Sequence, residues 1–378
     1  MARIVKLGVA GLGNAGRAVI RDLPAAPGVA LAAVADLRAE ALEPFRRDPA
    51  VETFDDVEAM CRSGNIDAVW VATPNQFHAA NAAAAAAAGK HVVCEKPMAL
   101  DLEECDRMIA AAAAGKVRLL MHSKAGDPPV IKMREIIAGG RLGRPIQISS
   151  WNYKGWLNLP RLPAELDTSR GGGVVYRQGA HQVDIVRALG GGPVKSVRAS
   201  AGRHHPGADT EGNYSAFLEF ADGAPATLVF NGHGRFDMTE ITWSIGEGGY
   251  ASRTTAEKSA LKNRAGAAAR REGEPRSDER REGPRRQPFF GLTLVSCEKG
   301  DIRQSPDGLY IYTDDGREEI ACPPFLDRAG ELVRLYEAVV EDRPVLADGK
   351  WGKATLEIVL AILESSRTRR EVELKYQF

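Results

Sequence analysis

Short apolar runs alternate with amphipathic stretches over the first 125 residues of the chain. Five runs have the length and continuity of buried β-strands, at residues 4–10, 29–35, 68–72, 91–94 and 117–121. The stretches between them have helical spacing, at 15–23, 39–46, 77–88 and 102–114, and Gly89 follows the third as a helix stop. Strand–helix alternation requires crossover connections, so this pattern predicts a parallel sheet covered by helices on both faces.

The pattern changes after about residue 145. Polar and apolar residues alternate at 214–220, 226–231 and 241–245, which is typical of strands with one buried face. Asp-Gly pairs at 222–223, 307–308 and 315–316 predict hairpin turns. Helical patterns return at 174–189, 329–341 and 353–367. We therefore expect a large, mostly antiparallel sheet with helices packed against it.

These two patterns predict two domains, residues 1–125 and 126–378. Two domains is the number expected for a chain of 378 residues. The last helix is expected to be able to pack back on the first domain. Residues 253–286 are rich in Arg, Glu, Gly, Ala and Pro and lack bulky apolar periodicity, so we expect a flexible insertion there. A basic arm that contacts a partner is the alternative, although interspersed acids weaken it.

The composition narrows the class of protein. Fifty basic residues balance 50 acidic ones, so no overall field favours nucleic acid or a membrane surface. We find no secretory signal and no apolar run of about 18 residues or more. The cysteines are scattered without a C-x-x-C pair and the histidines lack metal-ligand spacing, so we expect a cytoplasmic protein without disulfides or a metal. The five cysteines are Cys61, Cys94, Cys105, Cys297 and Cys322.

A glycine-rich hexapeptide follows the first predicted strand and opens the first predicted helix. Its G-x-G-x-x-G pattern, in that context, is typical of a dinucleotide-binding loop. Gly11 permits a tight turn, Gly13 lets the backbone approach a pyrophosphate, and Gly16 allows close packing of helix on sheet. The unpaired amides and the dipole of the helix start favour an anion. The residues predicted to hold the cofactor here are Gly11, Gly13, Asn14, Ala15 and Gly16.

Asp36 ends the second predicted strand, where an acid binds the ribose 2′-hydroxyl. Its charge would repel a 2′-phosphate, so the sequence favours NAD over NADP. Arg38 keeps NADP open, because an arginine can accommodate that phosphate. A purely structural turn or another nucleotide such as FAD is disfavoured, because loop, strand, helix and acid all agree.

Polar residues also follow the later strands of the first domain. Ligands of parallel sheets bind outside the carboxyl ends of the strands. Residues 73–78 and the tripeptide 95–97 both lie at such ends, on the side of the cofactor, and His122 ends another strand there. The further residues predicted to contact the cofactor are Thr73, Pro74, Asn75, His78, Glu95 and Lys96.

A second glycine-rich segment, at 171–173, precedes Gly179, His181 and Asp184, and the last two share a helix face because they are three residues apart. The glycine loop, the Glu-Lys-Pro strand end and this segment together resemble the Gfo/Idh/MocA (glucose–fructose oxidoreductase / inositol dehydrogenase) family. The resemblance implies an α/β Rossmann domain followed by an α+β domain with a large, open, mostly antiparallel sheet. In that family the sheet often makes subunit contacts, so a homo-oligomer, dimer or tetramer, is expected.

The resemblance also implies the catalytic residues. By this resemblance, Lys96 is expected to lie beside the nicotinamide and to hydrogen-bond the substrate oxygen, and His181 is expected to act as the general base. The chemistry agrees, because oxidation of an alcohol removes a hydroxyl proton, which a neutral imidazole accepts, and a hydride, which the nicotinamide accepts. An ammonium group stabilises the charge that develops on the oxygen.

One position departs from the family pattern, which has an aspartate four residues before the histidine. The residue here is Arg177. Its charge disfavours the imidazolium of His181 and would place a second cation beside Lys96, which is costly without compensation. An anionic substrate would compensate, since a guanidinium binds a carboxylate in bidentate fashion. The alternative is that Arg177 turns outward and pairs with a surface acid.

A narrower resemblance points to a substrate. The segments 151–153, 165–168, 181–184 and 295–298 resemble phthalate 4,5-cis-dihydrodiol dehydrogenases, which oxidise a carboxylated cyclohexadiene cis-diol to a catechol with NAD. Aromatisation would pull such a reaction forward. The alternatives are a sugar or polyol dehydrogenase of the same family and a non-catalytic NAD-binding regulator, which would need neither Lys96 nor His181. The expected substrate contacts are Arg177, Asp184, Trp151, Tyr153 and His122.

Overall fold

The computed structural model describes residues 3–159, 161–204, 210–253, 257 and 283–378. The described chain forms two compact units. The first unit contains the residues up to Ser123 together with Leu326–Leu356, and the second contains those from Lys124 to Phe325 together with Glu357–Phe378. Most of the predicted insertion at 253–286 lies outside the described residues.

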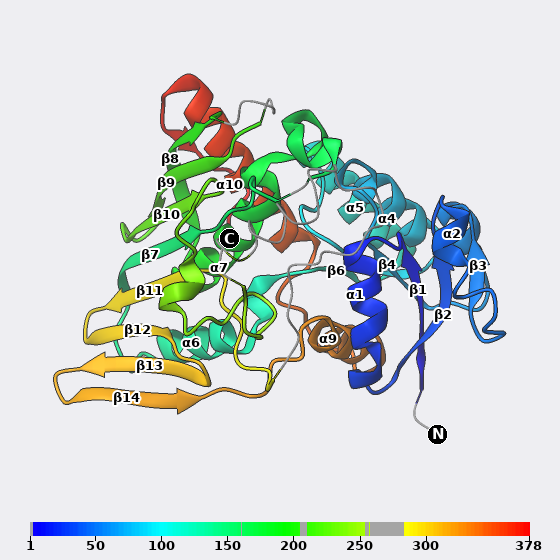
Figure 1. The fold of residues 1–378 in the computed structure, drawn as a ribbon, viewed down its shortest axis with the longest axis horizontal. Helices are drawn as coiled ribbons and strands as arrows, with labels where there is room; N and C mark the ends of the chain where they lie inside the picture. The colour runs from blue at the N-terminus through cyan, green and yellow to red at the C-terminus, as the bar shows by residue number, and fades with distance from the viewer. Residues whose placement is uncertain (1–2, 160, 205–209, 254–256, 258–282) are drawn as a thin grey trace. The chain divides into compact units, whose positions relative to one another are not determined.

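The first unit contains a six-stranded parallel sheet in the order β3-β2-β1-β4-β5-β6 (Figure 1). This confirms the predicted Rossmann sheet. The order reverses between β1 and β4, and α/β sheets bind their ligands at such a switch point. The unpredicted strand β3 has only three residues, too few for a recognisable apolar run. The strands are β1 Val5–Ala10, β2 Val29–Ala35, β3 Glu52–Phe54, β4 Ala68–Val71, β5 His91–Cys94 and β6 Leu119–Met121.

Helices connect these strands. The predicted helix at 39–46 is shorter in the structure and ends at Leu42. Pro44 has no backbone N–H, so it cannot donate the hydrogen bond that would continue the helix. Two helices from the end of the chain contribute to the first unit, α9 entirely and α10 with its first turns. The helices are α1 Asn14–Asp22, α2 Ala39–Leu42, α3 Val57–Cys61, α4 His78–Ala87, α5 Leu102–Gly115, α9 Arg328–Val340 and α10 Gly349–Thr368.

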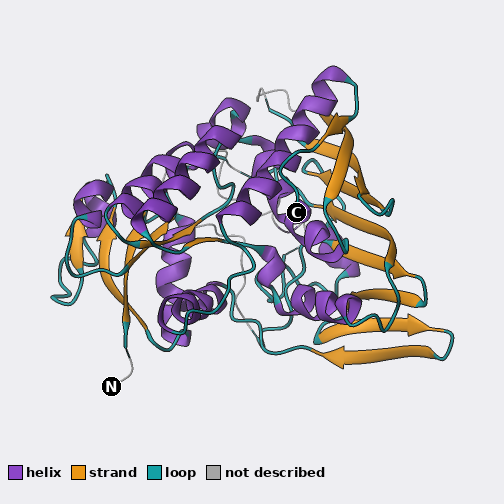
Figure 2. Cartoon of the chain, turned by 180° about the vertical axis from the view of Figure 1, so that it is seen from behind, coloured by secondary structure: helices purple, strands orange, loops and turns teal. Residues whose placement is uncertain are grey.

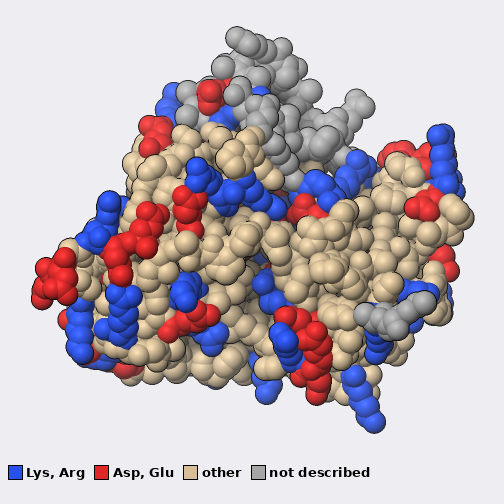
Figure 3. Space-filling model, turned by 90° about the horizontal axis from the view of Figure 1, so that it is seen from below, with Lys and Arg blue, Asp and Glu red and all other residues tan. Residues whose placement is uncertain are grey.

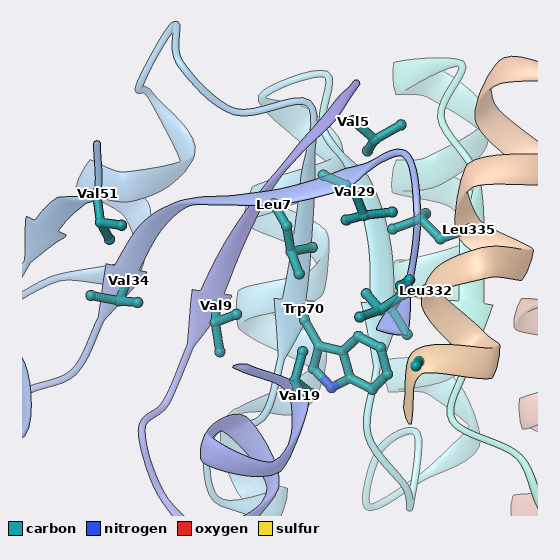
Figure 4. Close-up of a cluster of buried hydrophobic side chains, with 14 of the residues drawn as sticks. Val5, Leu7, Val9, Val19, Val29, Val34, Val51, Trp70, Leu332 and Leu335 are labelled. Atoms are coloured by element: carbon teal, nitrogen blue, oxygen red, sulfur yellow. The ribbon is translucent and has the colours of Figure 1, made fainter. Parts of the chain in front are cut away.

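A cluster of buried side chains joins α9 to the sheet. Leu332 and Leu335 of α9 are fully buried and belong to the same cluster as Trp70 of β4 (Figure 4). Burying each such side chain contributes roughly 1.5–3 kcal/mol. Helix α9 is therefore a fixed part of the first unit's core. The other cluster members labelled in Figure 4 are Val5, Leu7, Val9, Val19, Val29, Val34 and Val51.

The second unit contains a nine-stranded sheet in the order β14-β13-β12-β11-β7-β10-β9-β8-β15. Its pairs are antiparallel except β7 with β10, which confirms the predicted mostly antiparallel sheet. The three Asp-Gly turns join β9 to β10, β12 to β13 and β13 to β14, as predicted. The strands are β7 Pro145–Tyr153, β8 Val194–Gly202, β9 Asn213–Phe220, β10 Pro225–Asn231, β11 Leu292–Cys297, β12 Gly300–Gln304, β13 Gly308–Thr313, β14 Gly316–Ala321 and β15 Val372–Glu373.

Helices cover one face of this sheet. Helix α7, Ala180–Leu189, packs on β7 and β10, and α6, Pro128–Ala138, packs on β13. Side chains alternate accordingly, with Tyr214 and Leu218 of β9 buried and Phe217 44% exposed. Figure 2 shows the helices beside the sheet, whose other face is open in the part of the chain that the structure describes.

Two sequence expectations differ from the structure in the second unit. The predicted strand at 241–245 is wrong: a 3-10 helix, Met238–Ile241, ends there, and Trp243 and Ser244 have positive φ values of 52° and 59°. Asp237 starts this helix by accepting a hydrogen bond from the Thr239 amide, a local interaction that competes with strand pairing. The helix predicted at 174–189 is α-helical only in part, since a π-helix, Val175–Gly179, precedes α7.

Two features of the surface and the helices bear on partners. On the face in Figure 3, basic and acidic side chains are interspersed, without a large area of one sign. Among the residues that the structure describes, no helix combines the length and apolar character needed to cross a bilayer.

Candidate active site

The glycine loop connects β1 to α1, and one of its three motif glycines has room for a side-chain atom. At Gly11, φ is +91° and a Cβ would lie 2.6 Å from the Ala72 carbonyl oxygen. At Gly16 a Cβ would lie 1.9 Å from the Gly11 oxygen, whereas no described atom lies within 4 Å of one at Gly13. Gly13 also begins α1 without a side-chain cap. Contacts within the protein therefore require glycine at positions 11 and 16. The open space at Gly13 and the unpaired amides of the helix start fit an incoming pyrophosphate.

The Asp36 carboxylate is tied to this loop. It accepts hydrogen bonds from the Leu12 amide at 2.7 Å and from the Arg38 amide at 2.9 Å. Arg38 also donates Nε and Nη2, each at 2.9 Å, in a bidentate pair. Burial alone would raise the pKa of Asp36, but the hydrogen bonds from Arg38 and Leu12 lower it overall. Sequence reasoning found both residues and missed their ion pair, which places Arg38 against the acid that is predicted to bind the ribose.

His78 joins the loops that follow β4 and β5. Its side chain is 1% exposed, with Nδ1 2.7 Å from the Pro97 carbonyl oxygen and Nε2 2.8 Å from that of Thr73. Asn75 beside it is also buried. Thr73 Oγ1 accepts a hydrogen bond from Asn81. The sequence predicts a cofactor contact for His78, and the structure shows both ring nitrogens against backbone oxygens of the protein.

Glu95 and Lys96 stand at the carboxyl end of β5. The Glu95 amide donates to Val71, so the parallel pairing continues one residue beyond the strand. Arg328 of α9 donates Nε and Nη2 to Glu95 Oε1 at 3.2 and 3.0 Å. Burial alone would raise the pKa of Glu95, but the charges of His122, Arg328 and Lys96 lower it to about 2. Lys96 is half-buried, and its peptide bond to Pro97 is cis.

His122 follows β6 and lies between carboxylates. Its Nδ1 is 2.6 Å from Glu331 Oε2, and its Nε2 is 4.0 Å from Glu95 Oε2. Glu331 also accepts a hydrogen bond from the Ser123 amide. His122 was predicted to touch substrate, and the structure places it, 9% exposed, in a buried charged network with α9. Sequence reasoning missed Arg328 and Glu331, since nothing local links α9 to strands more than 200 residues earlier.

Helix α7 of the second unit carries His181 and Asp184, which are 6% and 5% exposed. The His181 ring meets the Phe290 ring edge-on at 5.2 Å, and Asp184 accepts a hydrogen bond from the Ala125 amide at 3.3 Å. Gln182, between them, donates to the Ser150 carbonyl oxygen on β7 at 2.8 Å and accepts from the Tyr214 hydroxyl. These bonds fix the rotation of α7 on the sheet, and with it the direction in which the His181 side chain leaves the helix.

Arg177 lies on the π-helix before α7 and forms an ion pair. Its Nη2 is 3.0 Å from Glu165 Oε1, and Arg161 Nη1 is 3.8 Å from the same oxygen. The Glu165 side chain is 7% exposed and that of Arg177 is 30% exposed. The Arg161 guanidinium stacks on Trp156 at 4.0 Å. The charge of Arg177 thus has a compensating carboxylate within the protein, and that carboxylate is buried, not on the surface as the alternative expected.

The two aromatic residues predicted to touch substrate lie near the end of β7. Trp151 is 40% exposed on the open face of the sheet, opposite the face on which α7 packs. Tyr153 is half-buried and contacts the Phe236 ring at 6.0 Å. Trp151 is therefore separated from His181 by the thickness of the sheet. Among the described residues, no cluster of three or more His, Cys, Asp or Glu has the arrangement of a metal site.

Comparisons with known proteins agree with this geometry. A family model described as an oxidoreductase family with an NAD-binding Rossmann fold matches residues 5–123, and one for the GFO/IDH/MocA C-terminal domain matches 130–251. The chain is 33% identical to 1-carboxy-3-chloro-3,4-dihydroxycyclohexa-1,5-diene dehydrogenase from Comamonas testosteroni, over 96% of this chain and 95% of that protein. It is 30% identical to myo-inositol 2-dehydrogenase from Thermotoga maritima, over 52% of this chain and 58% of the relative.

A solved structure of a protein from Bordetella bronchiseptica RB50 superposes with a TM-score of 0.90 at 35% identity, covering 98% of this chain and 100% of the other. The glycine loop, Asp36 and the Glu-Lys-Pro strand end thus occur in a fold and a sequence that match one family throughout. The chain belongs to the Gfo/Idh/MocA family and is an NAD-dependent oxidoreductase.

Proposed function

We propose that the protein oxidises a carboxylated cyclic cis-dihydrodiol to the corresponding catechol, with NAD as hydride acceptor. The observation that carries this proposal is the match along nearly the whole chain to a dehydrogenase whose name specifies a carboxylated dihydroxycyclohexadiene. Removal of one hydride and one proton from such a ring leaves a dienone that tautomerises to a catechol. The gain of aromaticity makes this direction favourable.

Two side chains carry the chemistry in this proposal. His181 accepts the proton of the reacting hydroxyl, since a neutral imidazole is a suitable base near neutral pH. Lys96 donates a hydrogen bond to the same oxygen and stabilises the negative charge that develops on it. The bound nicotinamide supplies the acceptor for the hydride. Because α7 is fixed to the sheet through Gln182, the base keeps its orientation during the reaction.

Arg177 is proposed to bind the carboxylate of the substrate. Its guanidinium is held on one side by Glu165 and is 30% exposed. A guanidinium carries five N–H donors, so one ion pair does not exhaust its capacity. Glu165 orients the group in this proposal and lowers the cost of keeping a partly buried cation. Asp184 is proposed to line the same pocket.

The cofactor is proposed to lie across the carboxyl ends of β1, β4 and β5. The amides of the loop at 11–16 would hold the pyrophosphate, and Asp36 the adenosine ribose. Thr73, Pro74 and Asn75 would line the path toward the nicotinamide. His78 and Glu95, whose side chains contact other parts of the protein, would act on the cofactor only through the loops that they hold.

A polyol dehydrogenase is the second candidate, favoured by the partial match to a myo-inositol 2-dehydrogenase. A substrate panel separates the two. Purified protein with NAD is supplied with a carboxylated cis-dihydrodiol, the same diol without its carboxylate, myo-inositol and an aldose, and NADH absorbance is followed. We expect kcat/KM to be highest for the carboxylated diol, by about tenfold or more over the uncarboxylated one. Faster oxidation of myo-inositol or the aldose would overturn the proposal.

We also propose a homo-oligomer and a cytoplasmic location. The open face of the large sheet exposes Trp151 and Phe217, at 40% and 44%, and exposed apolar residues on one face favour association. All five cysteines are free thiols, which fits a reducing compartment. Light scattering of the purified protein tests the first point: a dimer or tetramer is expected, and a monomer at micromolar concentration would contradict it.

A further inference from the structure

Lys96 is flanked by two residues that are each held by a distant side chain. Before it, the Glu95 carboxylate accepts two hydrogen bonds from Arg328, at 3.2 and 3.0 Å. After it, the Pro97 carbonyl oxygen lies 2.7 Å from His78 Nδ1. Arg328 and His78 both belong to the first unit but come from α9 and α4. The chain is thus held on either side of the one residue whose ammonium group is proposed to meet the substrate.

The Arg328 contact rests on a rigid support. Helix α9 is built into the core by Leu332 and Leu335, which have no exposed surface. One turn along from Arg328, Glu331 accepts hydrogen bonds from His122 and from the Ser123 amide. The same face of α9 therefore binds the carboxyl ends of both β5 and β6. A side chain on such a helix holds Glu95 more precisely than a side chain on a surface loop would.

The His78 contact links a second segment to the same place. The ring is buried, and its Nε2 lies 2.8 Å from the Thr73 carbonyl oxygen. Both ring nitrogens face carbonyl oxygens, which only accept hydrogen bonds. His78 therefore joins the loop after β4, where cofactor is proposed to pass, to the loop that follows Lys96. Movement of either loop would strain this bridge.

We infer that Arg328 and His78 are positioning residues for Lys96: they hold Glu95 and Pro97 so that the backbone of Lys96 cannot drift relative to the nicotinamide side of the sheet. The inference rests on the role proposed above for Lys96. A lysine side chain has four flexible carbon–carbon bonds, so the location of its Cα decides how often the ammonium group reaches the substrate oxygen. A displacement of about 1 Å in a reacting group can cost on the order of 100-fold in rate.

The test uses the full-length protein, NAD and the carboxylated cis-dihydrodiol. We would measure kcat, KM, NAD dissociation by fluorescence, and melting temperature for Arg328→Met, Arg328→Lys, His78→Gln and Lys96→Met. His91→Gln and Arg334→Met are matched controls: His91 lies at the opposite end of β5 and bonds the Arg118 amide, and Arg334 lies on the same helix as Arg328 and contacts Glu331. We expect kcat to fall about tenfold or more for Arg328→Met and His78→Gln. The dissociation constant of NAD should stay within about twofold for the Arg328 variants. His78→Gln is judged by kcat and the pH profile, because His78 also holds the loop after β4 along which the cofactor is proposed to pass. Arg328→Lys should recover part of the loss, and the controls should keep the wild-type kcat.

The alkaline side of the pH profile gives a second readout. If Lys96 is displaced, the pH dependence of kcat should shift in Arg328→Met and His78→Gln, which a general loss of folded protein would not produce. Should Arg328→Met fail to fold, Arg328→Lys and His78→Gln carry the test. If these variants keep wild-type kcat and pH profile while Lys96→Met is inactive, the inference is wrong and the proposed function stands. If Lys96→Met is as active as the wild type, the proposed role of Lys96 fails, and this inference with it.

Discussion

Arg177 and Glu165 form an ion pair of 3.0 Å in which the acid is buried and the guanidinium is partly exposed. Glu165 also caps the 3-10 helix Pro163–Leu166, in which it lies, by accepting a hydrogen bond from the Leu162 amide at 2.9 Å. This second contact holds the carboxylate in place beside the arginine. In the sequence, Glu165 precedes the glycine segment 171–173 and Arg177 follows it. A cation at position 177 is thus held in place by the protein, as a selective binding group needs to be.

Replacement of Arg177 tests this role. Arg177→Ala should raise KM for the carboxylated diol by about tenfold or more, the usual loss when a charge-assisted hydrogen bond is removed. The dissociation constant of NAD should stay within about twofold. KM for the uncarboxylated diol should change little, and steady-state kinetics with both diols gives the comparison. An equal rise in KM for the two diols, or no rise, would show that Arg177 does not bind the substrate carboxylate.

Two glycines of the cofactor loop should respond differently to the same substitution. A Cβ at Gly16 would clash with the Gly11 oxygen at 1.9 Å, so Gly16→Ala should lower the melting temperature markedly. At Gly13 no described atom lies within 4 Å, so Gly13→Ala should melt like the wild type. The methyl group added by Gly13→Ala would instead occupy space that the pyrophosphate needs. The affinity for NAD should therefore fall about tenfold or more. A Gly13→Ala protein with normal NAD affinity would contradict this placement of the cofactor.

Asp36 and Arg38 should control the choice between NAD and NADP. Asp36→Ala removes the carboxylate that repels a 2′-phosphate and releases Arg38 from its bidentate pair. We expect the preference for NAD over NADP to fall about tenfold or more, measured as the ratio of the two dissociation constants. Glu43→Ala is the control, because Glu43 forms an exposed pair with Arg46 away from the loop. An unchanged ratio in Asp36→Ala would show that another group selects the cofactor.

Acid should destabilise the first unit through Glu95. Its pKa in the folded protein is about 2, below the ordinary value of 4.5, so the folded state binds fewer protons than the unfolded state between these values. The stabilisation, about 3 kcal/mol, is therefore complete above pH 4.5 and is lost as the pH falls toward 2. Urea unfolding at neutral pH and at about pH 3 measures it, with Glu95→Gln as the comparison. The variant should lose less stability on acidification than the wild type. Equal losses of stability in the two proteins would show that other carboxylates cause the acid sensitivity.

Local signals made much of this fold predictable. The glycine loop, the acid at Asp36 and the Glu-Lys-Pro strand end are short motifs in which each residue's role depends on its immediate neighbours. The Asp-Gly turns fixed the hairpins of the large sheet in the same way. The predicted strand at 241–245 failed because two residues there adopt positive φ and Asp237 stabilises a helical turn, which alternation of apolar residues cannot reveal.

The contacts that give the site its shape come from long range. Arg328 and Glu331 meet β5 and β6 from a helix more than 200 residues away, and the Arg177–Glu165 pair depends on how the π-helix turns its side chains. No periodicity or spacing encodes such pairs, because they arise only when the core brings the elements together. Residues were therefore easier to predict than their partners, as His78 with Pro97 also shows.

The most direct test of the account is a crystal structure of the dead-end complex with NADH and the carboxylated cis-dihydrodiol, in which no hydride can be transferred. The quantities to read are the distances from Lys96 Nζ and from the nearer His181 ring nitrogen to the hydroxyl oxygen of the carbon beside the nicotinamide. We expect both to be hydrogen-bond distances to one oxygen, about 2.6–3.2 Å. A complex in which either group lies beyond the reach of a single bridging water from that oxygen would contradict it.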